Sequence, residues 1–387
     1  MNNFLIIILD GVGIGELPDA ANYNDLGSNT LSNMANFVGG LNLPNLQKMG
    51  LGNIYPIKGI DPIKSPLASF GKLAEVSLGK DSTSGHWEIG GLTIPHEFPY
   101  YPNGFPKELI DKFLEFTGEK GILGNCTASG TQIIEELGEE HINTRYPIVY
   151  TSADSVFQIA AHEEVIPIDR LYEICKISRE QVLVGKDAVG RIIARPFIGM
   201  PGSFSRTTNR KDFSLDPPSP TILDFALMNN IDTYGIGKIN DLFNYQGIKH
   251  QLKTKSNLQG IEKIIEVAKT AQNSLIMVNL VDFDVYYGHR NDPLGFNKAL
   301  QEFDLRLPEI LDSVDETDRI IFTADHGNDP TDISTDHTRE YVPLLFYQKG
   351  TRGKDLGIRG TFADIAQTAA HFFSINNNLS GKSFLNE

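Results

Sequence analysis

The sequence predicts an α/β protein, in which a mainly parallel sheet with helices on both faces is interrupted by a smaller inserted α/β domain. Three observations support this prediction. Short apolar runs that are typical of buried strands alternate with helical stretches over most of the chain. Proline and glycine cluster at 95–106, and proline again at 215–220, which indicates two crossings between domains. The first strand, at 4–9, finds its partners only beyond residue 220, so one domain must interrupt the other.

The elements of the core domain can be placed in order. The run Phe4–Leu9 is expected to be a buried first strand, because it is too short for a signal peptide, lacks a basic flank and ends at Asp10. A helix at 296–305 is expected to run into Pro308, where a further helical piece follows. The other core helices are expected at 30–37, 45–49, 222–228, 261–271 and 362–372, and the other strands at 233–236, 275–281, 320–324 and 342–347.

The inserted domain is expected at 98–215, which leaves 1–97 and 216–387 for the core. Its best-marked element is a helix at 106–116, which has proline at its first position and apolar residues along one face. We expect this domain to act as a cap. Its other elements are expected as helices at 131–137 and 171–177 and strands at 148–150 and 192–194.

The composition excludes several classes of partner. With 34 basic and 49 acidic residues the formal charge is −15, which argues against nucleic acid or an anionic membrane as a partner. No apolar run is long enough to span a membrane, and no obligate protein partner is evident. The two cysteines, Cys126 and Cys175, form no C-x-x-C motif, as expected of a protein in the reducing cytoplasm.

Carboxylates and imidazoles follow the ends of the expected core strands. Ligands gather at the carboxyl ends of parallel strands, so we expect these side chains to lie close together. Each one alone is as well explained by a helix cap or a structural histidine, but the set is suited to two divalent metals that clamp a phosphoryl group. Asp282 competes with Asp284, and Asp329, Asp332 and Asp336 are further alternatives. The candidate metal ligands are Asp10, Asp284, His289, Asp325, His326 and His337.

A hydroxyl nucleophile is expected in the polar stretch 79–88. Ser82, Thr83 and Ser84 all lie there, and a hydroxyl beside a divalent metal loses its proton more easily. The alternative is that these are ordinary turn residues.

Six stretches of the chain resemble the phosphopentomutase family of the alkaline phosphatase superfamily, in order and along the whole length. They read Asp-Gly-Val-Gly-Ile-Gly at 10–15, Gly-Lys-Asp-Ser-Thr-Ser-Gly-His-Trp-Glu at 79–88, Tyr-Thr-Ser-Ala-Asp-Ser-Val at 150–156, Asp-Phe-Asp and Gly-His-Arg within 282–290, Thr-Ala-Asp-His-Gly-Asn at 323–328 and Asp-His-Thr-Arg-Glu at 336–340. The resemblance implies that one metal, usually manganese, is held by Asp10, Asp325, His326 and the nucleophile, and the other by Asp284, His289 and His337.

The resemblance also implies roles for a nucleophile and for substrate-binding residues. The family nucleophile falls on Ser82, where members usually carry threonine, and Thr83 stays an alternative. Asp154 would meet the sugar hydroxyls, and guanidinium groups suit the non-reacting phosphate. The residues implied for that phosphate are Arg191, Arg206 and Lys238, with Arg195 and Arg210 as alternatives.

The implied reaction interconverts α-ribose 1-phosphate and ribose 5-phosphate, and the 2-deoxyribose pair, through a phosphoenzyme. A sugar bisphosphate is the expected intermediate and activator, pentose phosphates are the expected small-molecule partners, and the cap is expected to exclude water. The alternatives are a metal-dependent phosphatase or sulfatase on the same core, a phosphoglycerate mutase, which is a longer protein with a different nucleophile motif, and a metal-binding protein without catalysis.

Overall fold

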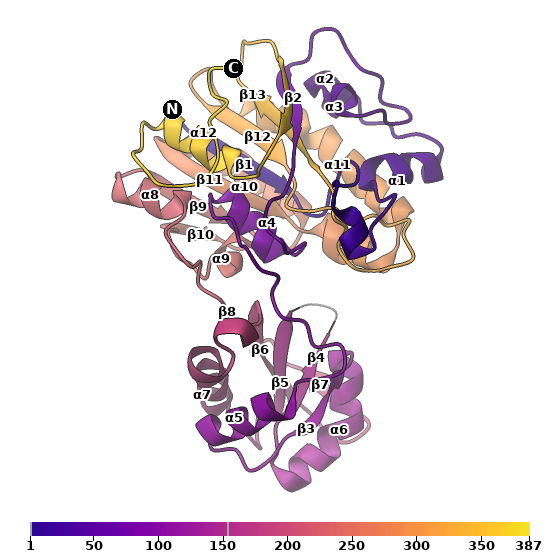
Figure 1. Ribbon diagram of the computed structural model, residues 1–387, viewed down its shortest axis with the longest axis vertical. Helices are drawn as coiled ribbons and strands as arrows, with labels where there is room; N and C mark the ends of the chain where they lie inside the picture. The colour runs from indigo at the N-terminus through magenta and orange to yellow at the C-terminus, as the bar shows by residue number, and fades with distance from the viewer. Residues whose placement is uncertain (1, 153–154) are drawn as a thin grey trace. The chain divides into compact units, whose positions relative to one another are not determined.

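The computed structural model describes residues 2–152 and 155–387. The chain divides into two compact units, a larger one formed by Met1–Glu97 and Pro217–Glu387 and a smaller one formed by Phe98–Asp216 (Figure 1). These bounds differ by one residue from those expected. The role of the smaller unit as a cap stays a prediction.

The larger unit is built on an eight-stranded sheet with the order β10-β9-β11-β1-β12-β13-β2-β14. The five strands from β10 to β12 are parallel, and β13 runs antiparallel to both of its neighbours. The prediction of a mainly parallel sheet is therefore confirmed. The strands are β1 (Phe4–Leu9), β2 (Ala68–Leu73), β9 (Asp232–Ile236), β10 (His250–Leu252), β11 (Ser274–Leu280), β12 (Arg319–Thr323), β13 (Val342–Tyr347) and β14 (Asp355–Arg359).

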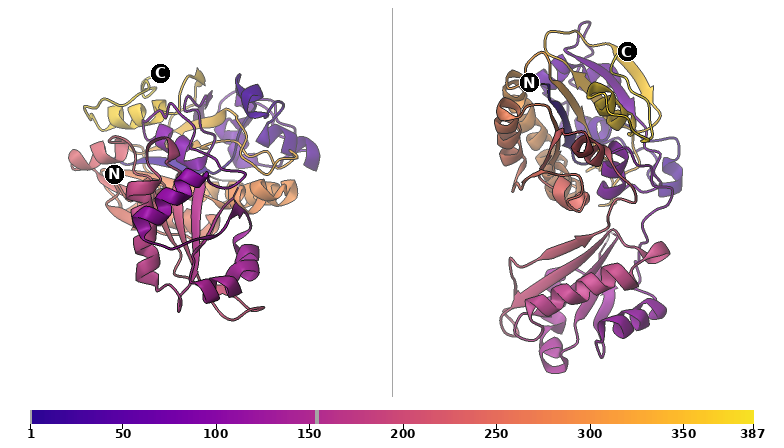
Figure 2. Two further views of the ribbon diagram at one scale, coloured as in Figure 1. Left: turned by 60° about the horizontal axis from the view of Figure 1, so that its bottom comes forward. Right: turned by 90° about the vertical axis from the view of Figure 1, so that its left-hand side faces the viewer.

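Strand β1 lies at the centre of this sheet, between β11 and β12. Phe4 pairs with Leu275 on one side and with Arg319 on the other, so the first strand does find its partners beyond residue 220. All six of its residues are buried, because helices cover both faces of the sheet (Figure 2). The helices are α1 (Thr30–Val38), α2 (Pro44–Met49), α3 (Leu51–Ile54), α4 (Ser82–Ile89), α8 (Ile222–Met228), α9 (Ile239–Leu242), α10 (Asn257–Thr270), α11 (Pro293–Asp312) and α12 (Asp364–Phe372).

Helix α11 does not break at Pro308, contrary to the expectation from sequence. Proline cannot donate the backbone hydrogen bond that would reach the carbonyl of Asp304 one turn earlier. The side-chain amide of Asn45 donates to that carbonyl instead, at 2.9 Å. The helix therefore continues because a side chain of the neighbouring helix α2 satisfies the group that proline leaves free.

The polar stretch at 79–88 also differs from a simple turn, because most of it forms helix α4. The Asp81 carboxylate accepts from the backbone amides of Thr83 and Ser84, at 2.9 and 3.1 Å, and so caps the helix. This cap makes Ser82 the first residue of α4.

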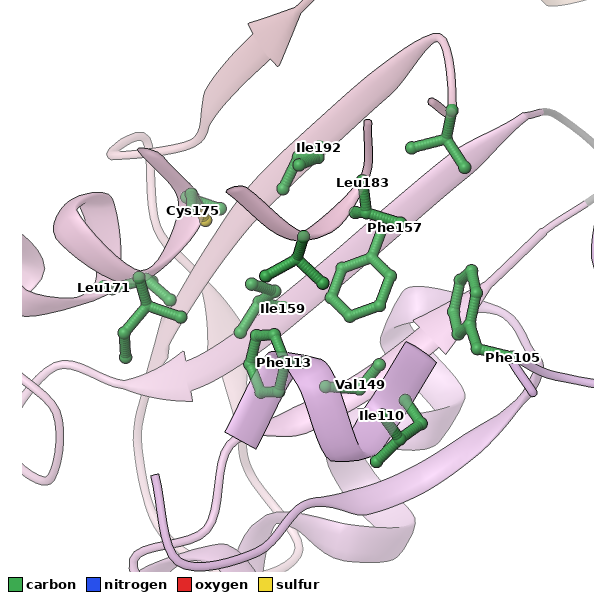
Figure 3. Close-up of a cluster of buried hydrophobic side chains, with 14 of the residues drawn as sticks. Phe105, Ile110, Phe113, Val149, Phe157, Ile159, Leu171, Cys175, Leu183 and Ile192 are labelled. Atoms are coloured by element: carbon green, nitrogen blue, oxygen red, sulfur yellow. The ribbon is translucent and has the colours of Figure 1, made fainter. Parts of the chain in front are cut away.

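The smaller unit has a six-stranded sheet with the order β3-β4-β5-β6-β7, in which β8 also pairs with β6. Aromatic and aliphatic side chains, among them Phe113, Phe157 and Leu171, pack α5 and α7 against the sheet in one core cluster (Figure 3). A second cluster, around Ile133 and Phe197, packs α6. The elements are β3 (Leu123–Thr127), β4 (Ile148–Thr151), β5 (Val156–His162), β6 (Arg191–Ile198), β7 (Ser205–Arg206), β8 (Lys211–Ser214), α5 (Lys107–Thr117), α6 (Gly130–Thr144) and α7 (Ile168–Ile177).

Within the described residues, no helix is both long enough and apolar enough to cross a membrane.

Candidate metal centre and nucleophile

The six candidate metal ligands come from neighbouring strands of the larger unit. Asp10 directly follows β1 and Asp325 lies just beyond the end of β12, while Asp284 lies in a short π-helical turn, Phe283–Tyr287, beyond β11. His337 lies in the loop that leads to β13, the other neighbour of β12. Because β11, β1 and β12 are parallel and adjacent, their carboxyl ends bring these side chains to one edge of the sheet.

The first group consists of Asp10, Asp325 and His326, all buried. His326 Nε2 lies 3.4 Å from Asp10 Oδ1 and 3.3 Å from Asp325 Oδ2. His326 Nδ1 is 3.0 Å from the carbonyl oxygen of Gly327, which can only accept, so the Nδ1 proton is held there and Nε2 faces the carboxylates. Among the described residues, Asp10 Oδ1 has no hydrogen-bond partner, and Asp325 Oδ2 faces two imidazole nitrogens, His326 Nε2 and, at 3.0 Å, His86 Nδ1. Buried carboxylate oxygens of this kind fit a bound cation.

The second group consists of Asp284, His289 and His337. Asp284 Oδ2 lies 3.2 Å from His289 Nε2, and Asp284 Oδ1 lies 3.5 Å from His337 Nε2. His289 Nδ1 is 2.6 Å from the carbonyl oxygen of Thr335, so its Nε2 is the nitrogen left for a ligand. The two Nε2 atoms are 3.1 Å apart, an arrangement in which a shared cation would suit both lone pairs.

The two groups are close enough to act together. Potential ligand atoms of Asp284, His326 and His337 all lie within 4.8 Å of one another, so His326 is near both groups. The carboxylates are held ionised. Burial raises the pKa of Asp284, but His337 and His289 outweigh it and hold that pKa well below its usual range. Burial acts likewise on Asp325, whose pKa is held well below its usual range chiefly by His326 and His86.

The alternative carboxylates have structural partners instead. Asp282 Oδ2 accepts from the backbone amide of Asn257 at 2.7 Å, which satisfies the first turn of α10. Asp329 accepts from the backbone amide of Asn29 at 3.0 Å. The structure thus brings Asp284, and not Asp282, to the histidines.

Ser82 places its hydroxyl against the first group. Its Oγ lies 3.2 Å from His326 Nε2 and accepts a hydrogen bond of 3.0 Å from Lys238 Nζ. Lys238 Nζ is also 3.7 Å from Asp10 Oδ2. Ser82 is buried, whereas Thr83 is partly exposed and reaches none of these groups in the described structure.

Lys238, which was expected at the non-reacting phosphate, lies instead beside the Ser82 hydroxyl, and the remaining substrate-binding candidates lie in the smaller unit. Arg210 makes two hydrogen bonds of 2.8 Å to the Asp212 carboxylate, and Arg191 lies 3.8 Å from it. Arg195 donates to Gln158 at 2.8 Å. Arg206 lies in the two-residue strand β7. Asp154 falls outside the described residues.

Comparison with known proteins identifies the family. A model of the metalloenzyme superfamily matches residues 2–377. A phosphopentomutase of Dictyoglomus turgidum is 57% identical over 388 residues, covering 100% of this chain and 98% of the relative. A phosphopentomutase of Dictyoglomus thermophilum is 58% identical over 386 residues, with the same coverage. The chain belongs to the phosphopentomutase family.

Solved structures of low sequence identity share the fold. A protein of Pyrococcus horikoshii has a TM-score of 0.51 at 15% identity, with 98% of each chain covered. A phosphoglycerate mutase of Leishmania mexicana has a TM-score of 0.50 at 12% identity, with 98% of this chain and 97% of the other covered. The expected α/β class and the family resemblance are both confirmed, and the family model together with the two ligand groups indicates that this phosphopentomutase relative binds divalent metal.

Several polar residues that surround this centre are not among those predicted from the sequence. His86 and Asn279 are buried and contact each other beside Ser82 and Asp10, and Asn328 donates to Asp284 Oδ1 at 2.7 Å. His86 lies within the stretch at 79–88, but only the helical register of α4 shows that it faces inward. Asn279 interrupts an apolar strand, which was the one available signal.

Proposed function

We propose that this phosphopentomutase relative interconverts α-D-ribose 1-phosphate and D-ribose 5-phosphate, and the corresponding 2-deoxyribose phosphates. The observation that carries the proposal is the position of Ser82 Oγ, 3.2 Å from Nε2 of His326, which lies close to the other ligands of both groups. Curated relatives above 50% identity over the whole chain, which are named phosphopentomutase, support it.

Asp10, Asp325 and His326, with Ser82, would hold one divalent metal, and Asp284, His289 and His337 the other; we propose manganese for both. When bound, such a pair of cations neutralises charge on a transferring phosphoryl group. The chain adds two further sources of positive potential at Ser82 Oγ. Lys238 donates a hydrogen bond to it, and the N-terminus of α4 carries the positive end of the helix dipole.

The reaction is a double phosphoryl exchange. Phosphorylated Ser82 gives its phosphoryl group to the free hydroxyl of the sugar phosphate, so that the bond from phosphorus to Ser82 Oγ breaks as the bond to the sugar oxygen forms. The proton of the sugar hydroxyl passes to Ser82 Oγ, which Lys238 stabilises as the leaving oxygen. The bisphosphate then turns round and returns its other phosphate to Ser82, and the same bisphosphate serves as the activator.

The smaller unit would supply the binding of the non-reacting phosphate. Arg191 and Arg206 are the proposed contacts, with Arg195 and Arg210 as alternatives, because planar guanidinium groups bind phosphate through paired donors. Asp154 is proposed to bind the sugar hydroxyls. Cys126 and Cys175 are free thiols, which supports the proposal that the protein is located in the reducing cytoplasm.

The test is a phosphorus NMR time course. Manganese-loaded protein, primed with a trace of ribose 1,5-bisphosphate, would be given α-ribose 1-phosphate. Formation of ribose 5-phosphate with little free phosphate is expected. Free phosphate as the main product would instead show a phosphatase, and metal binding without any turnover would show a metal-binding protein.

A further inference from the structure

A line of buried hydrogen bonds joins the nucleophile to the metal centre through two residues with no role in the reaction described above. His86 lies in α4, one turn after Ser82, and its side chain is fully buried. Asn279 lies near the end of β11 and is buried equally well. Both residues belong to the larger unit, and they meet beside Asp10.

The contacts form one continuous path. His86 Nδ1 lies 2.8 Å from the carbonyl oxygen of Ser82 and 3.0 Å from Asp325 Oδ2, so His86 also faces the first ligand group directly. His86 Nε2 lies 3.1 Å from Asn279 Nδ2, and the same Nδ2 donates to Asp10 Oδ2 at 2.9 Å. We call Ser82, His86, Asn279 and Asp10 the relay, in the sense of a chain of hydrogen bonds that fixes positions.

The donor and acceptor groups of the relay allow only one assignment of its hydrogen atoms. The carbonyl oxygen of Ser82 can only accept, so His86 carries its proton on Nδ1. His86 Nε2 then accepts one hydrogen of the Asn279 amide, and Asp10 accepts the other. Turning the Asn279 amide round would set its oxygen against the Asp10 carboxylate, so the orientation shown is the one that satisfies both neighbours.

The relay also leaves the correct atoms free for metal. Asp10 Oδ2 is occupied by Asn279, whereas Asp10 Oδ1, which faces His326 Nε2 at 3.4 Å, has no hydrogen-bond partner among the described residues. Fixing one carboxylate oxygen orients the other towards the cation site. At its other end, the relay holds the backbone of Ser82, the residue that carries the nucleophilic hydroxyl.

We propose that His86 and Asn279 are positioning residues, which hold Ser82 and Asp10 in the mutual register that metal binding and phosphoryl transfer require. This inference rests on the proposed function of the site. A purely structural pair of buried side chains would contribute to folding stability alone. A positioning pair must in addition set metal affinity, and its two members must act as one unit.

The experiment is a double-mutant cycle with His86→Ala, Asn279→Ala and the double variant, each in the full chain. Manganese affinity would be measured by calorimetry, and the rate of phosphoenzyme formation from ribose 1,5-bisphosphate by rapid quench. Each single variant is expected to weaken manganese binding and slow phosphorylation about 10- to 100-fold. The double variant is expected to bind manganese and form the phosphoenzyme no less well than the more strongly impaired single variant, because either change already breaks the relay.

A control separates positioning from folding. Thr233→Val removes a buried hydroxyl that donates to the carbonyl of Gly247 at 2.7 Å and accepts from the amide of Lys249 at 2.9 Å, near the start of β9. It is expected to lower the melting temperature without changing manganese affinity. The conservative variant His86→Asn keeps a donor near the Nδ1 position, and is expected to recover part of the affinity lost in His86→Ala.

Two outcomes would overturn the relay: manganese affinities in the single variants equal to that of the wild type, or single losses that simply multiply in the double variant. Failure of the proposed function would look different. Wild-type protein would then form no phosphoenzyme, while the dependence of manganese affinity on His86 and Asn279 would still decide the relay.

Discussion

The carboxylate of Glu340 accepts hydrogen bonds from both the backbone amide and the hydroxyl of Thr30, at 2.9 and 2.8 Å. It also accepts from the amide of Gly15 at 3.1 Å and from the hydroxyl of Thr338 at 2.7 Å. Thr30 begins α1, Gly15 lies in the loop after β1, and Thr338 directly follows His337. One buried carboxylate therefore ties together the loops on which the metal centre is built.

The close packing around Glu340 explains two glycines. A Cβ atom added to Gly13 or to Gly327 would lie 2.4 Å from a carboxylate oxygen of Glu340, well inside any permitted contact. These positions need glycine because the carboxylate approaches the backbone directly, without any left-handed conformation at either residue.

Glu340 is expected to make the protein less stable as the pH rises from about 5 to about 7. Burial raises the pKa of Glu340 to about 7, although hydrogen bonds from Thr338 and Thr30 oppose the rise. The folded state therefore binds the proton more tightly than the unfolded state, whose pKa stays near the ordinary value. The contribution of Glu340 to the free energy of unfolding is complete below that ordinary value and is lost as the pH rises towards 7. The loss is ~1.4 kcal/mol for each unit by which the folded pKa exceeds the unfolded pKa.

Denaturant unfolding of manganese-loaded protein at several pH values would measure this loss. In Glu340→Gln, which cannot titrate, the same loss should be missing, although the variant is less stable throughout because an amide cannot accept from all four donors. Parallel pH profiles for the two proteins would show that Glu340 does not titrate in this range.

The nucleophile can be assigned by a pair of single substitutions. Ser82→Ala is expected to reduce turnover at least ~1000-fold and to abolish the phosphoenzyme, because the oxygen beside His326 is lost. Thr83→Ala should keep most of the activity, since its side chain is partly exposed and away from the centre. Mass spectrometry of phosphorylated peptides would check the assignment, and phosphate on Thr83 would reverse it.

Asp284 and Asp282 offer a matched comparison for the second group. Asp284→Asn is expected to weaken binding of one manganese ion by at least tenfold, because the carboxylate that faces His289 and His337 loses its charge. Asp282→Asn should leave both manganese affinities intact. Its cost would be about 1 kcal/mol of stability, since it weakens the bond to the first turn of α10. Calorimetric titration with manganese would distinguish the two, and equal effects would reopen the choice of ligand.

The strand-end residues could be predicted from the sequence because the carboxyl ends of adjacent parallel strands lie at the same edge of the sheet. The carboxylates after β1 and β12 and beside β11 had to meet once those strands became neighbours. The same reasoning could not find His86 or Glu340. Their roles depend on which way α4 is turned and on the close approach of loops that lie about 300 residues apart, as Thr30 and Glu340 do.

Local expectations failed where a side-chain hydrogen bond satisfied backbone groups that would otherwise end or prevent a helix. Proline at 308 predicts a helix end, yet Asn45 satisfies the carbonyl that Pro308 leaves free. The serines and threonine after Asp81 are compatible with a turn, yet the Asp81 side chain caps them into a helix. In both cases the local sequence disfavours a helix, and a side-chain hydrogen bond stabilises the helix nevertheless.

His141 is expected to make the smaller unit sensitive to acid. Its Nδ1 lies 2.7 Å from the carbonyl oxygen of Tyr146, and its Nε2 accepts from the amide of His162 at 2.9 Å. Burial is the main cause that lowers the pKa of His141, and the charges of His162 and Arg145 act in the same direction. The neutral form is thus favoured on folding, so its stability is present above the ordinary histidine value and is lost as the pH falls below it.

Hydrogen exchange would test this at the His162 amide. Protection of that amide should fall between pH 7 and pH 5 in the wild type, because a protonated His141 can no longer accept from it. In His141→Gln, whose acceptor does not titrate, protection should stay level over the same interval once the intrinsic exchange rate is subtracted. A pH-independent wild type would contradict the expectation.

Arg339 is expected to be irreplaceable by lysine, although the charge would be kept. Its buried guanidinium donates from Nη1 to Glu75 Oε2 at 2.8 Å and to the carbonyl oxygens of Ser77 and Gly79 at 2.8 and 3.0 Å. Its Nη2 donates to Asp19 Oδ2 at 3.1 Å and to the carbonyl oxygen of Glu75 at 3.2 Å. A lysine ammonium lacks the planar fork that reaches all of these acceptors, so buried acceptors would be left without donors. We expect Arg339→Lys to lose about 3 kcal/mol of unfolding free energy. Arg306→Lys, in a partly exposed pair with Glu309, provides the control and should change the free energy of unfolding by less than about 0.5 kcal/mol.

The same substitution should also reduce catalysis, because the segment from Glu75 to Gly79 leads directly into the cap of α4 and so to Ser82. If Arg339 holds that segment, turnover should fall while manganese affinity stays close to the wild-type value, since its side-chain hydrogen bonds in the described part of the chain go to Asp19, Glu75, Ser77 and Gly79 and to none of the six candidate ligands. Steady-state kinetics with saturating manganese, beside calorimetry on the same samples, would separate the two effects. A loss of stability with unchanged turnover would mean that the segment keeps its position without the guanidinium group.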